Sequence, residues 1–117
     1  MKTSYFAKIR KILKENQSAD IVAISRTTPA GYNGKTAPEL FPSAKLLSDY
    51  KNNLINEEEY TVRYKNEVLL KLDLNEIYNK YKNSILICWE GTGKFCHRRI
   101  IADEIKTQLG ISVEEYI

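Results

Sequence analysis

Both cysteines and the single histidine of this 117-residue chain lie in ILICWEGTGKFCHRR, residues 85–99. Its Gly91-Thr92-Gly93-Lys94 stretch resembles the end of a nucleotide-binding P-loop, which requires glycine, four spacers and then Gly-Lys-Ser/Thr. Cys88 stands where the first glycine belongs, and Phe95 replaces the hydroxyl residue. The P-loop is therefore excluded. The side chains that still need a role are Cys88, Glu90, Cys96, His97, Arg98 and Arg99.

Cys96 is the first candidate catalytic residue. It is expected at the start of a helix beside His97 and two arginines, where positive charge favours the reactive thiolate. The alternative is a small, half-buried residue at a tight helix start, and both interpretations stay open. Cysteine phosphatase and rhodanese-type loops place arginine six residues after the cysteine, where this chain has Ala102. Neither of those two chemistries is supported.

His97 and Glu90 are the other two candidate catalysts. His97 precedes Ile101 by one helical turn and so lies on the expected buried stripe, which fits either a core histidine or a catalytic one. Glu90 follows a predicted strand and can act as a general acid or base, or hold an arginine in place. The sequence does not separate these roles.

Cys88, Cys96 and His97 offer three soft metal ligands, but their spacing argues against a metal site. The chain has no paired Cys-x-x-Cys spacing and no clear fourth ligand, so neither a metal nor a cofactor is predicted. Cys88, in mid-strand, is interpreted as a core residue. Both cysteines are interpreted as thiols, as expected of a cytoplasmic protein. A thiol redox protein would require Cys88 and Cys96 to meet across the loop between them.

Two apolar, β-rich runs predict the strands that must position these side chains. They are Asp20–Ser25 and Ser84–Trp89, and a helix is expected from about Cys96 to Gly110. Residues 26–42, with three prolines and two glycines, predict a long irregular loop. Further helices are expected at residues 5–14 and 46–54, after Asn56 and after Asp73, with a final edge strand within residues 111–116. This alternation predicts an α/β layered domain with a small, mainly parallel sheet.

The predicted strands bring two distant segments to one edge of the sheet. If the two strands are parallel neighbours, Arg26 leaves the first where Glu90 leaves the second, and the Cys96 helix begins there too. The free amides at that helix start, together with Arg26 and Arg98, predict an anion-binding pocket. Arg99 is expected instead to pair with Asp103 on the surface.

The composition is that of an ordinary soluble domain. The chain is 43% hydrophobic and 28% charged, with a net charge of +3, and one domain over residues 1–117 is expected. It has no apolar run long enough for a membrane span and no signal peptide pattern, so a cytoplasmic protein without a membrane partner is predicted. The basic residues Lys8, Arg10, Lys11 and Lys14 on the first helix are interpreted as a solvated face in preference to a nucleic-acid surface.

The motifs resemble those of the domain of unknown function 488 (DUF488) family, in its short form. The resemblance rests on Ser25-Arg26-Thr27-Thr28-Pro29, on APELFPS (residues 37–43), on Tyr60 and Tyr64, and on LICWEGTGKFCHRRIIADE (residues 86–104). It implies a Rossmann-like three-layer domain in which the first residues form a strand. It also implies a set of site positions: Ser25, Arg26, Pro29, Tyr60, Tyr64, Glu90, Cys96, His97 and Arg98. No established activity comes with the family.

The leading functional prediction is a small enzyme that binds an anionic, nucleotide-type ligand at the N-terminus of the helix that begins at Cys96. Arg26 and Arg98 would contact the anion, and Cys96, His97 and Glu90 would be the catalysts. Ser25, Pro29, Tyr60 and Tyr64 would line the ligand-binding site. The alternatives are a non-catalytic nucleic-acid-binding module and a thiol redox protein using Cys88 and Cys96. The oligomeric state is not predicted.

Overall fold

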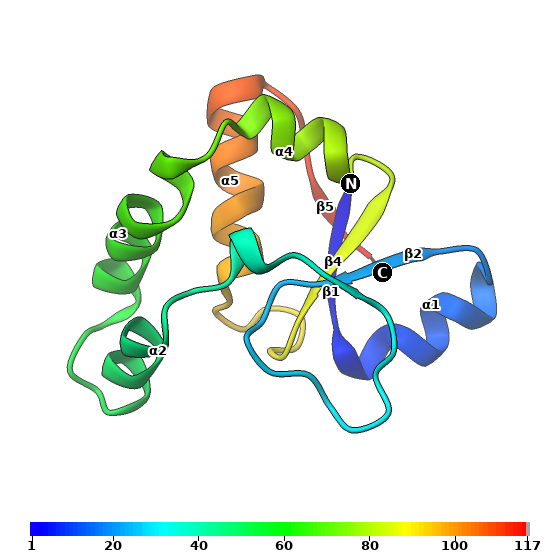
Figure 1. Ribbon diagram of the computed structural model, residues 1–117, viewed down its shortest axis with the longest axis horizontal. Helices are drawn as coiled ribbons and strands as arrows, with labels where there is room; N and C mark the ends of the chain where they lie inside the picture. The colour runs from blue at the N-terminus through cyan, green and yellow to red at the C-terminus, as the bar shows by residue number, and fades with distance from the viewer. Residues whose placement is uncertain (117) are drawn as a thin grey trace.

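Five short strands form one parallel sheet in the computed structural model, which describes residues 1–116 (Figure 1). Their order across the sheet is β3-β2-β4-β1-β5. The central strand β4 pairs in parallel with β2 on one side and β1 on the other. The bounds are β1 Lys2–Tyr5, β2 Asp20–Ala23, β3 Lys35–Thr36, β4 Ser84–Cys88 and β5 Glu114–Glu115. The predicted parallel α/β architecture is confirmed.

Several of the helices begin or end at residues with clear local signals. Ser43 caps its helix by accepting the Leu46 amide, and Asn56 forms a reciprocal capping box with Glu59. Gly110 ends the last helix in the left-handed conformation, with φ of 70°. The α-helices are α1 Ile9–Glu15, α2 Ala44–Lys51, α3 Glu57–Glu67, α4 Leu74–Tyr81 and α5 His97–Leu109, and the 3-10 turns are Phe6–Lys8, Pro38–Leu40 and Leu69–Lys71.

Both faces of the sheet are covered, which makes the domain three-layered and Rossmann-like. Successive side chains of a strand point to opposite faces. Val22 and Leu86 therefore pack into the larger core beneath α2 to α5, while Ile21 and Ile85 pack against α1. Figure 1 shows α1 on one side of the strands and the other helices on the other. None of the helices within residues 1–116 has the length and apolar character needed to cross a bilayer.

The N-terminus differs from the expectation of a helix over residues 5–14. Lys2–Tyr5 form β1, which pairs with both β4 and β5, and the regular helix begins only at Ile9. Between two parallel neighbours, backbone hydrogen bonding outweighs the helical spacing of the apolar residues. The strand implied by the DUF488 resemblance is confirmed. Arg10, Lys11 and Lys14 remain exposed on α1.

The long loop predicted for residues 26–42 is largely irregular but contains two short elements. Lys35–Thr36 add the edge strand β3 to β2, and the amide of Ala37 donates to the Ala23 carbonyl at 2.9 Å. The turn at Pro38–Leu40 buries Leu40 in the larger core. The loop is thereby anchored beside the carboxyl end of β2, and its last proline, Pro42, lines a cavity described below.

Candidate functional site

The carboxyl ends of β2 and β4 meet at one edge of the sheet. Ala23 is paired with Ile87, and the amide of Ile24 donates to the Ile87 carbonyl at 2.9 Å. The chain therefore leaves β2 through Ser25 and Arg26 next to the point where it leaves β4. Helix α5 begins at the same edge, because a short loop connects it to β4. The geometry expected from parallel neighbouring strands is present.

A cavity of about 350 Å³ opens at this edge. Strand ends, the α5 start and helices α2 and α3 all contribute to it. Arg26 on its wall is exposed, and its guanidinium forms no ion pair within residues 1–116. The lining residues are Ser25, Arg26, Thr27, Pro42, Leu47, Tyr50, Lys51, Tyr60, Cys88, Trp89, Glu90, Phe95, Cys96 and His97.

Aromatic rings form one wall of the cavity. Tyr50 of α2, Tyr60 of α3 and Phe95 of the loop before α5 contact one another, with ring centroids 5.3–5.5 Å apart. Trp89 lies on the cavity lining and donates from its indole to the Thr27 carbonyl at 3.1 Å. Only Tyr60 of these was expected in the site. Tyr50 shares the helical spacing of core residues, so the sequence carries no signal that separates it from them.

A tight turn directs the chain from β4 into α5. The Lys94 amide donates to the Gly91 carbonyl at 3.1 Å, and Gly93 has φ of 81°. A positive φ at the third residue is the mark of a type II turn, in which glycine is favoured. Gly91 and Gly93, which resemble part of a P-loop in the sequence, are thus residues of a β-turn. The turn places Phe95 against the aromatic wall and Cys96 at the helix start.

His97 is buried at the back of the cavity. Its Nε2 lies 2.7 Å from the Ile24 carbonyl oxygen, and its Nδ1 lies 3.7 Å from Cys96 Sγ. A carbonyl oxygen only accepts, so Nε2 carries the proton and the Nδ1 lone pair faces the sulfur. Burial lowers the pKa of His97 to about 4, which keeps the imidazole neutral near pH 7. His97 therefore links α5 to the end of β2 and also borders the cavity.

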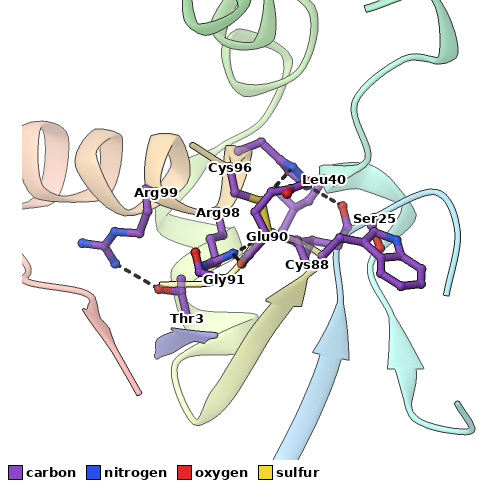
Figure 2. The surroundings of a disulfide bond; sticks show 12 residues. Thr3, Ser25, Leu40, Cys88, Glu90, Gly91, Cys96, Arg98 and Arg99 are labelled. Carbon is purple, nitrogen blue, oxygen red and sulfur yellow. Dashed lines mark hydrogen bonds between the residues drawn. A yellow bond between two sulfur atoms is a disulfide. The ribbon is translucent and has the colours of Figure 1, made fainter. Parts of the chain in front are cut away.

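The two cysteines are joined in a disulfide. Cys88 at the end of β4 and Cys96 at the start of α5 share a bond across the turn, and no free cysteine exists in the described part of the chain (Figure 2). The expectation of two thiols is therefore wrong for this structure. The turn brings the end of the strand back to the helix start, which places the sulfurs together. Cys88 is buried in the core, as expected, but it also lines the cavity.

Arg98 is fully buried and does not line the cavity. Its guanidinium pairs with the Glu115 carboxylate of β5, with a shortest distance of 2.8 Å. It also donates to the carbonyl oxygens of Glu90 at 2.6 Å and Gly91 at 3.2 Å, and to Cys88 Sγ at 2.9 Å. Figure 2 shows the side chain reaching from α5 toward the start of the turn. Every donor direction is used within the fold, which leaves no part of this guanidinium for a ligand.

Of the remaining predicted site residues, Ser25 lines the cavity, Tyr64 lies in the core, and Pro29 lies in neither. Ser25 lines the cavity, and its hydroxyl donates to the Thr27 carbonyl at 2.6 Å. Tyr64 is fully buried, donates to the Leu40 carbonyl at 2.7 Å and lies behind Tyr60. Pro29 is not among the lining residues. Arg99 bonds to the Thr3 hydroxyl and the Val113 carbonyl, both at 2.9 Å, in place of the expected pairing with Asp103.

The family model described as the active DUF488-N3 subclade (DUF488-N3a) matches residues 5–109, which is most of the chain. The chain belongs to the DUF488 family. Comparison with curated proteins and with solved structures gave no match. The matched span of this DUF488 domain contains every residue of the cavity wall.

The Arg98–Glu115 ion pair of this DUF488 domain predicts a pH-dependent contribution to stability. Burial of Glu115 raises its pKa, but the hydrogen bonds from Arg98 and Thr3 outweigh burial and hold the pKa below the 4.5 of an unperturbed glutamate. A carboxylate with a lowered folded pKa stabilises the fold above its unfolded pKa, and the stabilisation is lost as pH falls through the folded value. We therefore expect the stability difference between wild type and Glu115→Gln to shrink as the solution is acidified below the unfolded pKa.

Urea denaturation at a series of pH values measures this difference. Glu114→Gln is the matched control, because the neighbouring Glu114 is exposed and has no ion pair among residues 1–116. Its stability difference from wild type should stay small at every pH. A Glu115→Gln difference that is constant from neutral to acidic pH would contradict the prediction.

Proposed function

We propose that this DUF488 domain is an enzyme that binds an anionic, nucleotide-type ligand in the strand-end cavity. The observation that carries the proposal is that one cavity is lined by both Arg26 and the start of α5. Arg26 has no ion-pair partner among the described residues. The cavity volume of about 350 Å³ lies within the roughly 300–1,000 Å³ of small-molecule sites. A cavity of this volume is of the size that holds a mononucleotide-sized ligand.

The anionic group is proposed to bind Arg26 and Lys51. Both side chains are exposed at the cavity, one after β2 and the other at the end of α2. Two cations from separate segments support recognition of a phosphate or carboxylate, since charge-assisted hydrogen bonds are stronger than neutral ones. The first turn of α5 adds a favourable dipole, and Cys96 at its cap position makes no side-chain hydrogen bond to it. Arg98 is left out of the proposed contacts, because its donors are already engaged.

The nucleotide part of the proposal rests on the aromatic wall. Tyr50, Tyr60 and Phe95 present ring surface in the same cavity as the two cations. A ligand with a planar ring at one end and an anion at the other uses both features, because stacking on aromatic rings contributes about 1–3 kcal/mol per base. Burial raises the pKa of Tyr60 well above its usual value, so its hydroxyl stays protonated and can donate to the ligand.

Glu90, Cys96 and His97 are the proposed catalytic residues. Glu90 is exposed at the cavity and is the candidate acid or base. In the reduced protein the Cys96 thiol would face the Nδ1 lone pair of His97, which could accept the thiol proton, and both residues line the cavity. A second candidate function, dithiol–disulfide exchange, is favoured by the Cys88–Cys96 bond on the cavity wall. In that reaction a dithiol substrate would gain the disulfide as the protein gains two thiols.

Calorimetric titration with phosphate, a nucleoside and nucleoside monophosphates tests the binding proposal. Arg26→Ala should weaken nucleotide binding about tenfold or more, the loss expected for a charge-assisted contact, with the melting temperature unchanged because Arg26 is exposed. Arg10→Ala removes an exposed arginine from α1 and is the matched control. Equal binding by Arg26→Ala would refute the anion site, and a large fall in its melting temperature would make Arg26 structural.

Chromatography of the same mixtures distinguishes an enzyme from a binding module. Product formed by wild type and lost in Glu90→Gln, with binding retained, supports the catalytic assignment. Ligand that binds but is recovered unchanged supports a non-catalytic module. A nucleic-acid-binding module would in addition show affinity for polynucleotides that falls steeply with salt and depends on Arg10, Lys11 and Lys14.

A further inference from the structure

We propose that Cys88, Cys96 and His97 bind a thiophilic divalent metal ion such as Zn²⁺ when the two cysteines are reduced. The two sulfurs and a His97 ring nitrogen lie within 4.8 Å of one another, and all three side chains are buried. Ligand atoms placed about 2.0–2.3 Å from a tetrahedral zinc ion are about 3–4 Å from each other. The three donors are thus close enough for a zinc site after small shifts, because no pair lies more than 4.8 Å apart and only the bonded sulfurs must separate.

Reduction supplies that separation. A dithiol reductant gives two electrons and two protons to the Cys88–Cys96 bond, forming two thiols while the reductant becomes a disulfide. Each thiol then releases its proton as its sulfur binds the ion. The Cα atoms of the two cysteines lie 7.3 Å apart, so one ion fits between the side chains without closer approach of the backbones.

The orientation of His97 is that of a metal-binding histidine. Its Nε2 proton donates to the backbone carbonyl of Ile24 at 2.7 Å, which fixes the ring and the tautomer. Histidine ligands of metals commonly donate their second nitrogen to a carbonyl or carboxylate in this way. The other nitrogen, Nδ1, is left with its lone pair 3.7 Å from Cys96 Sγ. The spacing in the sequence lacks a zinc motif because the third ligand is the neighbour of the second, at a helix start.

The surrounding charges favour two thiolates at this position. Arg98 donates to Cys88 Sγ at 2.9 Å and is itself paired with Glu115. Cys96 lies at the cap position of the 13-residue helix α5, where the helix dipole stabilises negative charge. Two thiolates neutralise a divalent ion, and Glu115 neutralises Arg98. The buried cluster is therefore balanced in charge when the metal is bound.

The fourth coordination position would face the cavity, because all three residues are among those that line it. A site with three protein ligands and an open position is the arrangement of catalytic zinc, which polarises a bound water or substrate oxygen. Only this last step, action on an anionic ligand, rests on the proposed function. Metal binding itself depends on the Cys88, Cys96 and His97 side chains alone.

Cobalt titration under anaerobic conditions tests the site. The protein is reduced with dithiothreitol, the reductant is removed by gel filtration, and Co²⁺ is added to reduced and to oxidised protein. We expect one equivalent of Co²⁺ bound by reduced protein, with thiolate-to-cobalt absorption and the intense visible bands of tetrahedral cobalt, both removed by Zn²⁺. Oxidised protein should show neither. Cys88→Ser, Cys96→Ser and His97→Gln should each bind at least about tenfold more weakly.

Two results would overturn the proposal. One is reduced wild type that keeps its circular dichroism spectrum but shows no cobalt absorption. The other is absorption that persists in both cysteine variants, which would place the ion elsewhere. The comparison of reduced with oxidised protein uses wild type only, so its result does not depend on whether the variants fold. The titration contains no nucleotide, so its failure leaves the anionic-ligand proposal intact, and failure of the Arg26 test leaves the metal site intact.

Discussion

Arg98→Ala is expected to lower the free energy of unfolding by roughly 3–5 kcal/mol, the usual cost of removing one partner of a buried ion pair. The side chain has no exposed surface and bonds to Glu115, to the carbonyl oxygens of Glu90 and Gly91, and to Cys88 Sγ. Its removal leaves a half-buried carboxylate and two carbonyls without their partner. The loss is a large part of the roughly 5–15 kcal/mol by which domains are stable. Urea denaturation followed by circular dichroism measures it.

Arg99→Ala is the matched control on the same helix. Arg99 is only partly buried and loses two hydrogen bonds, to Thr3 and Val113, so a smaller cost of about 1–2 kcal/mol is expected. The double variant Arg98→Met/Glu115→Met should be more stable than Arg98→Ala, because it removes the charge left unpaired. If Arg98→Ala is as stable as wild type but binds the ligand more weakly, Arg98 contacts the ligand, as expected from the sequence.

His97→Ala is expected to cost roughly 2–4 kcal/mol of stability. The substitution leaves the Ile24 carbonyl without its buried hydrogen bond, worth about 1–3 kcal/mol, and it opens a hole against Tyr64, whose ring lies 5.4 Å from the imidazole. Since Ile24 directly follows β2, the lost bond also loosens the end of this strand from α5. Thermal and urea unfolding of the variant measure the effect.

His97→Gln separates the hydrogen bond from the rest of the side chain. The glutamine amide can donate to the Ile24 carbonyl in place of Nε2, so this variant should recover part of the lost stability. It should not recover metal binding, because it lacks the Nδ1 lone pair that faces Cys96. A His97→Ala protein that is as stable as wild type but has no activity would show that His97 has a catalytic role and no structural one.

Features set by short-range chemistry were predictable from the sequence. The helix expected after Asn56 begins there with an Asn56–Glu59 capping box, and Gly110 ends α5 with a positive φ. The apolar runs that begin at Asp20 and Ser84 are neighbouring strands. Each depends on residues a few positions apart or on a plain apolar run. The meeting of the segments after these strands then follows from parallel pairing.

Other features depended on partners far away in the chain. Residues 2–5 form a strand because β4 and β5, about 80 and 110 residues later, pair with them. The role of Arg98 is set by Glu115, a residue outside the predicted site. In each case the outcome depends on a contact between residues far apart in the chain, which the local sequence pattern does not show.

The sequence by itself determined the class of fold, the strands that end at the site, and the presence of Arg26, Glu90, Cys96 and His97 near one edge of the sheet. Only the tertiary structure decided that the cysteine sulfurs meet, that Arg98 points into the fold, and that Tyr50 and Phe95 line a cavity. The physical reason is that caps and apolar periodicity act between near neighbours in the chain. The direction and partners of a side chain depend on what the whole fold packs around it.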